Sequence, residues 1–163
     1  MSDNPLHIPK RRKEVMLWVH PDGQVFCDVF LATEERGEEN PFDLFNRDEP
    51  FLVVFRKGPE QPCFYNRNAI IRVEYPESEG SGYPPDSGEP PLTCHLHLMD
   101  GSLIEGSIHE SLPTDRARLF DYLNRREERF LRVLLEEGRT CLVNKSYINH
   151  VTLTGEESGP TGR

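Results

Sequence analysis

The chain has 163 residues, a length that suits one ordinary domain or two very small ones. Only 36% of its residues are hydrophobic and 29% are charged, and it holds 14 prolines and 12 glycines, so we expect part of it to be linker or tail. Its 19 basic and 28 acidic residues leave a net charge of −9, which argues against a broad surface for nucleic acid or anionic membrane. No apolar run approaches the roughly 20 residues that a membrane span needs.

Composition divides the chain into five parts. Residues 1–13 are predicted to be a basic tail, and residues 155–163 a disordered C-terminal tail. Residues 76–91 hold five prolines and three glycines and are predicted to be an extended linker. The linker separates two small domains, residues 14–75 and 92–154.

The first domain opens with a strand over 15–19, a turn at Pro21-Asp22-Gly23 and a return strand over 25–31. A short helix follows, with Asn40 as its N-cap and Pro41 in its first position. Asn46 stands where a helix ends in a left-handed residue. Three more strands are predicted, over 51–55, 63–65 and 71–75.

The sequence of the second domain predicts the same elements in the same order. Its strands cover 94–98, 103–108, 130–135, 141–143 and 150–154, and Asp100-Gly101 forms the first turn. Its helix is expected to be capped by Thr114 and to end at Asn124.

An internal repeat explains this agreement, because most of the first domain aligns with the second at an offset of 78 residues. Identical residues occur in order along the whole unit, from Asp22-Gly23 on Asp100-Gly101 to Val73 on Val151. We infer a tandem duplication of a domain of about 60 residues, close to the lower size limit for a single core. The predicted fold is mainly β with short helices, arranged as two tandem small β-barrels of SH3-like or Sm-like type.

The second unit also resembles a known family. Its helix reads Arg118-Leu119-Phe120-Asp121-Tyr122-Leu123-Asn124, and the strands Phe130-Leu131 and Leu142-Val143-Asn144-Lys145 follow. This is similar to a bacterial domain family of unknown function with an R-L-x-D-x-L-N helix and a V-N-K strand. The resemblance covers nearly all of 92–154 and holds more loosely for 14–75. It implies a small β domain and no activity.

The strand order also looks like the Sm-like fold, whose RNA-binding members carry an Arg-Gly or similar pair on a late strand. Here the matching places hold Asn66-Arg67 and Asn144-Lys145. They could form two equivalent sites for an anion, a nucleotide or an acidic peptide. The alternative is that each asparagine turns the chain and each cation is solvated.

Histidines and cysteines give a weaker signal. His95 and His97 would share one strand face and could bind a metal, with His109 or His20 as a third ligand; the alternative is a solvated face. The four cysteines show no metal-site spacing, and the N-terminus has no apolar signal core. We therefore expect a cytoplasmic protein with reduced thiols and no cofactor.

Catalytic motifs are missing from the sequence, so we expect no enzyme. Asp43 and Asp121 recur in both units and could each serve as a general base or hold a helix end. The run Met16, Leu17, Trp18 and Val19 is apolar on both strand faces, which predicts that it is covered by the other unit, a second copy or another protein.

These observations predict a bacterial adaptor or regulatory protein that binds a protein partner. One alternative is an Sm-like nucleic-acid binder using Arg67 and Lys145, assisted by the basic run Lys10 to Lys13. A second alternative is a metal or small-ligand sensor using His95 and His97.

Overall fold

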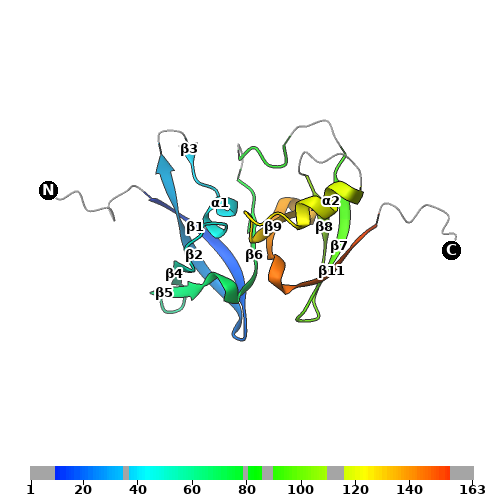
Figure 1. Ribbon diagram of the computed structural model, residues 1–163. Helices are drawn as coiled ribbons and strands as arrows, with labels where there is room; N and C mark the ends of the chain where they lie inside the picture. The colour runs from blue at the N-terminus through cyan, green and yellow to red at the C-terminus, as the bar shows by residue number, and fades with distance from the viewer. Residues whose placement is uncertain (1–9, 35–36, 79–80, 86–89, 110–115, 155–163) are drawn as a thin grey trace. The chain divides into compact units, whose positions relative to one another are not determined.

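The computed structural model describes residues 10–34, 37–78, 81–85, 90–109 and 116–154 (Figure 1). It is mainly β, with eleven strands and two short α-helices among the described residues, which confirms the predicted fold class at that level. The strands pair in an open antiparallel order that does not close among the described residues. Closed barrels are therefore not observed.

The chain forms two compact units, residues 1–73 and 74–163. The first holds β1 (Lys10–Val19), β2 (Gly23–Glu34), β3 (Gly37–Glu38), α1 (Pro41–Phe45), β4 (Phe51–Arg56), β5 (Gln61–Asn66) and the start of β6 (Ile70–Pro76). Its strand order is β6-β1-β2-β4-β5, and β3 pairs with β2. Figure 1 draws β1 and β2 as the long blue strands of this unit.

The second unit holds the end of β6, then β7 (Leu92–Leu98), β8 (Leu103–Ile108), α2 (Arg116–Leu123), β9 (Phe130–Leu134), β10 (Arg139–Asn144) and β11 (Ile148–Leu153). Its strand order is β11-β7-β8-β9-β10, and the end of β6 is the next neighbour of β10. In both units the fifth strand of the repeat thus lies beside the first, followed by the second, third and fourth.

The hairpin turns form where glycine was predicted to supply a positive φ. Gly23 has a φ of 88° and Gly101 one of 89°, values that side chains with a Cβ rarely adopt. The two hairpins have equal length, because seven residues separate the paired Leu17 and Val25 and seven separate the paired Leu96 and Ile104. Gly101 therefore stands one place earlier in its hairpin than Gly23 does.

The burial pattern corrects the predicted alignment of the first strands. The buried residues of β1 are Val15, Leu17 and Val19, and those of β7 are Cys94, Leu96 and Leu98. Leu17 therefore matches Leu96 at an offset of 79 rather than 78. Met16 and Trp18 in turn take the positions that His95 and His97 hold in the second unit.

The start of α1 follows its sequence signals, whereas its end does not. Asn40 Oδ1 accepts a hydrogen bond of 2.9 Å from the Asp43 N–H, and Pro41 begins the helix. Asn46 was predicted to be left-handed, but its φ is −96°. Its Nδ2 instead donates to Phe42 O at 3.0 Å, and Asn124 Nδ2 donates to Phe120 O at 2.8 Å. The asparagines close the helices with their side chains, and Thr114 lies outside the described residues.

Two predicted boundaries also shift. Lys10 to Lys13 belong to β1 instead of a tail, since they pair in register with β2 and Arg11 forms an ion pair of 3.0 Å with Glu38. Part of the predicted linker is packed: Tyr83 is buried, and the Arg132 guanidinium lies 4.0 Å from its ring centroid. The predicted tails at 1–9 and 155–163 lie outside the described residues.

Candidate functional site

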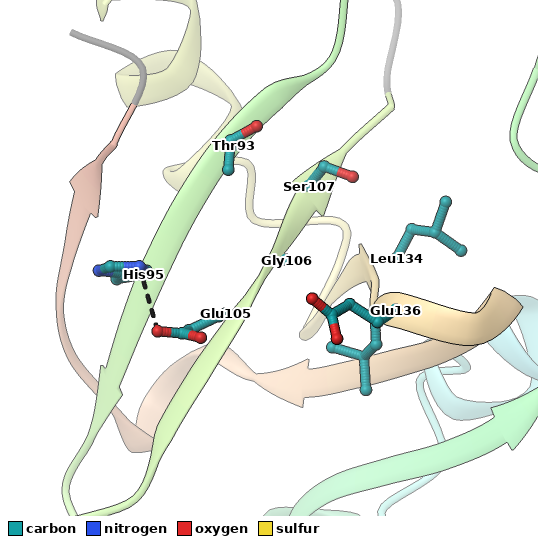
Figure 2. A pocket seen from close by; sticks show the side chains of 8 residues that line it. Thr93, His95, Glu105, Gly106, Ser107, Leu134 and Glu136 are labelled. Carbon is teal, nitrogen blue, oxygen red and sulfur yellow. Dashed lines mark ion pairs between the residues drawn. The ribbon is translucent and has the colours of Figure 1, made fainter. Parts of the chain in front are cut away.

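A groove of about 350 Å³ opens on the second unit. It lies beside β7, β8 and the end of β9 with the two residues that follow it. Figure 2 shows His95 and Glu105 on neighbouring strands, with Glu136 across from them. The side chains around it are mostly polar, and its lining residues are Thr93, His95, Glu105, Gly106, Ser107, Leu134, Leu135 and Glu136.

The groove exists because β8 pairs differently with its two neighbours. It pairs with β7 along its whole length, from Leu103 to Ile108, but with β9 it pairs at Ser107 and Leu134. At that crossing β9 comes very close to Gly106. A Cβ on Gly106 would lie 2.4 Å from Val133 Cγ1 and 2.6 Å from Leu134 O, so glycine is required at this point.

Negative charge dominates the groove. The Glu105 side chain is 66% exposed, and Glu136 is exposed as well. His95 Nε2 lies 3.4 Å from Glu105 Oε1, a contact that becomes an ion pair when the imidazole is protonated. The described lining contains no lysine or arginine. This arrangement favours a cationic ligand over an anionic one.

A hydroxyl and an imidazole meet at one side of the groove. Ser107 Oγ lies 2.7 Å from His109 Nε2, and the Tyr83 ring meets the His109 ring edge-on at a centroid distance of 6.1 Å. Serine beside histidine is the first part of a nucleophile site, which also needs a group that orients the base and donors for an oxyanion. The contacts of Ser107 and His109 are explained equally well by a structural role, in which they hold β8 against the buried Tyr83.

The structure places the predicted metal-binding histidines on one strand face, as expected from their spacing. The His97 ring stacks on His150 at 4.1 Å and 12°, and the His95 ring lies 6.5 Å from His97. Within the described ranges, no group of three or more histidine, cysteine, aspartate or glutamate side chains is arranged to hold a metal ion. His109 contacts Ser107 instead, and His20 belongs to the turn of the first unit.

Arg67 is placed as a structural residue. Its side chain is 1% exposed and donates to the backbone carbonyls of Leu44 at 2.9 Å, Phe51 at 2.7 Å and Glu49. Asn66 Oδ1 accepts from the Asn68 N–H at 2.8 Å and so starts a short 3₁₀ turn. This geometry favours the turn interpretation for Asn66 over the anion site, but Arg67 is buried rather than solvated as that interpretation expected.

Lys145 takes the matching place in the second unit. Its Nζ donates to Arg125 O at 3.1 Å and lies 3.4 Å from Tyr122 O. Burial lowers the pKa of Lys145 below its usual value, because desolvation disfavours the ammonium. Asn144 Oδ1 accepts from the Ser146 N–H at 3.0 Å. Neither pair, Asn66 with Arg67 or Asn144 with Lys145, belongs to the lining of the groove.

The remaining predicted residues do not belong to the lining of the groove. Asp43 sits in the first turn of α1, and Asp121 is exposed on α2. Leu17 and Val19 belong to the core, whereas Met16 and Trp18 are half-buried on the opposite face of β1.

Trp18 has a cover within its own unit. The Arg72 guanidinium lies 3.8 Å from the Trp18 ring centroid. Arg72 and Trp18 match His150 and His97 of the second unit, where two imidazoles stack instead. This part of the cover comes from β6 within the same unit, whereas the sequence predicted a cover by the other unit, a second copy or another protein.

Sequence reasoning found His95 but missed the groove. Thr93 and His95 alternate with buried residues of β7, and Glu105 and Ser107 lie opposite them on β8, which marks one polar face. The missing wall comes from Leu134, Leu135 and Glu136, and no local pattern shows that the chain returns there.

Comparison with protein-family models, with curated proteins and with solved structures finds no match to this chain. Among the described residues, neither α1 nor α2 has the length and apolar character needed to cross a membrane.

Proposed function

We propose that this chain is a non-catalytic adaptor or regulatory protein whose second unit binds a basic segment of a partner protein. The observation that carries this proposal is the groove walled by Glu105 and Glu136, whose described lining has no lysine or arginine. Two carboxylates at an open groove can accept charge-assisted hydrogen bonds from a lysine or arginine side chain.

The proposed architecture is two tandem small barrels of SH3-like or Sm-like type, left open at their ends. The equal strand order of the two units and the duplicated sequence support it. Units this small rarely enclose a deep pocket, and an open surface groove suits a peptide segment better than a small substrate.

Electrostatics adds to the proposal at longer range. The net charge of −9 would attract a basic partner and speed its encounter with the groove. The same charge repels a polyanion such as RNA, and the two cations of the predicted nucleic-acid site donate to backbone carbonyls.

The test measures binding of two fluorescent probes: an octapeptide rich in lysine and arginine, and a single-stranded oligouridine of similar length. The peptide should bind, and the double variant Glu105→Gln with Glu136→Gln should weaken it by roughly ten-fold or more. The matched control removes two exposed carboxylates from the first unit, with Asp48→Asn and Glu49→Gln, and should change binding little.

Equal losses in the groove variant and the control would show that only net charge matters, which would refute the groove. Oligouridine binding that falls steeply with salt would instead favour the nucleic-acid alternative. One-to-one zinc uptake lost on His97→Ala would favour the sensor alternative.

A further inference from the structure

Two strands end the hydrogen-bonded order, β5 in the first unit and β11 in the second. In the described part of the chain, β5 pairs with β4 alone and β11 with β7 alone. The duplication makes β5 the counterpart of β10, and β11 the counterpart of β6. Each end strand can therefore be compared with an inner strand of the same kind.

The comparison shows apolar surface left open at β5. Phe64 is 70% exposed and its neighbour Phe51 is 55% exposed. Their counterparts in the second unit, Leu142 and Phe130, are fully buried. Both positions hold apolar residues in both units, although those of the first unit are exposed. Exposed apolar residues of this kind are expected where a surface is covered when the protein binds a partner or a second copy.

The same difference holds for the fifth strands. Ile70, Val73 and Tyr75 of β6 are buried, whereas their counterparts on β11 are only half-buried. Those counterparts are Ile148, Val151 and Leu153.

The inner strands show which element covers this kind of edge. In the second unit, β10 has the end of β6 as its next neighbour. A fourth strand of the repeat therefore takes a fifth strand at its outer side. β5 is a fourth strand without such a neighbour among the described residues, and β11 is a fifth strand that is equally uncovered.

Neither edge carries the charges that normally prevent association. β5 (Gln61–Asn66) and β11 (Ile148–Leu153) contain no aspartate, glutamate, lysine or arginine, in a chain with 29% charged residues.

Pro62 is compatible with this edge. The Arg67 N–H donates to Pro50 O at 2.7 Å. Along a strand, the N–H and C=O groups of successive residues point alternately to its two sides. The groups of residues two and four places before Arg67 therefore point to β4, whereas those of Pro62 point outward. Phe64 and Asn66 then present their N–H and C=O groups to the outside.

We propose that β5 of one copy pairs with β11 of a second copy of this chain, in the way that β10 takes the end of β6. The contact joins two different strands, so it leaves one β5 and one β11 open at the ends of each pair. Such a head-to-tail contact builds a closed ring of two or more copies, or a longer chain of copies.

Sedimentation of the full chain over a range of concentrations tests the association. The weight-average mass should rise with concentration from that of one copy to that of two copies or more. Phe64→Lys should weaken association by about ten-fold or more, because it places a charge on the edge. Phe120→Lys is the matched control, since Phe120 is 67% exposed on α2, and it should leave association unchanged.

Hydrogen–deuterium exchange identifies the strands. On association, amides of both β5 and β11 should gain protection, and Phe64→Lys should abolish both gains together. A monomer at every concentration would overturn the proposal, and so would association that Phe64→Lys does not weaken. Protection of β5 alone would also overturn it, since that result indicates a symmetric β5 contact.

Peptide binding by the groove is measured separately, in the Phe64→Lys variant. Loss of self-association therefore leaves the proposed function standing, and failure of peptide binding leaves the edge contact standing.

Discussion

The side chain of Arg67 is charged and yet almost fully buried, a state that is costly without hydrogen bonds to the charged group. Three backbone carbonyls, from Leu44, Glu49 and Phe51, accept its hydrogen bonds and tie the end of α1 to β4. We expect Arg67→Ala to lower the free energy of unfolding by about 2–4 kcal/mol, because the carbonyls lose their donors inside the protein. Urea denaturation measures this loss.

The second unit supplies the control for this prediction. Lys145 fills the same position with a single ammonium that reaches two carbonyls. Arg67→Lys should therefore cost clearly less than Arg67→Ala. If the two variants lose equal stability, or if Arg67→Ala loses none, the structural role of Arg67 is refuted.

The cysteines also differ at the residue scale. Burial raises the pKa of Cys27 to about 12 and that of Cys94 to about 11, so both thiols stay protonated at neutral pH. Cys63 is only partly buried on β5. In native protein at pH 8, a thiol reagent should modify Cys63 first, and Cys27 and Cys94 only as the protein unfolds. Equally fast modification of Cys27 would contradict the structure.

At the scale of elements, Gly106 sets how closely β8 and β9 cross beneath the groove. Gly106→Ala places a methyl group against Val133 and the carbonyl of Leu134, and the backbone atom cannot move aside on its own. We expect a loss of about 1–3 kcal/mol in the free energy of unfolding. Thermal unfolding with Glu105→Ala as the neighbouring control, expected within about 0.5 kcal/mol of wild type, checks it.

The elements show where sequence reasoning works and why it stops. Gly23 and Gly101 were predictable, because a positive φ restricts the residue type. Asn40 was predictable as well, since its side chain bonds within one turn of its own position. The end at Asn46 was mispredicted because one residue type can close a helix in two ways, by left-handed backbone or by side-chain donation.

The candidate site was less predictable than the elements, for a physical reason. The polar alternation of Thr93 and His95 is a local signal, but the groove needs β9 to cross β8 at Ser107 and Leu134. Likewise, nothing local distinguishes the exposed Phe64 from the buried Leu142, because burial depends on which strand lies alongside. The sequence therefore predicted the strands, but it did not predict which strand edges lack a neighbour.

At the scale of the whole molecule, the two proposed contacts have opposite physical origins. The groove would bind a basic segment through the carboxylates of Glu105 and Glu136, so added salt should weaken that binding by screening. The β5 and β11 edges carry no permanent charge, and they join copies that each have a net charge of −9. Added salt screens the repulsion between copies and should strengthen their association.

One salt series measured by sedimentation and by peptide binding therefore separates the two contacts. Between low and moderate salt, we expect the association constant of the copies to rise and that of the basic peptide to fall. Phe64→Lys should remove the first trend and keep the second, whereas the double variant of Glu105 and Glu136 should do the reverse. Self-association that weakens with salt would mean that charged groups hold the copies together, and the apolar edge would then be the wrong surface.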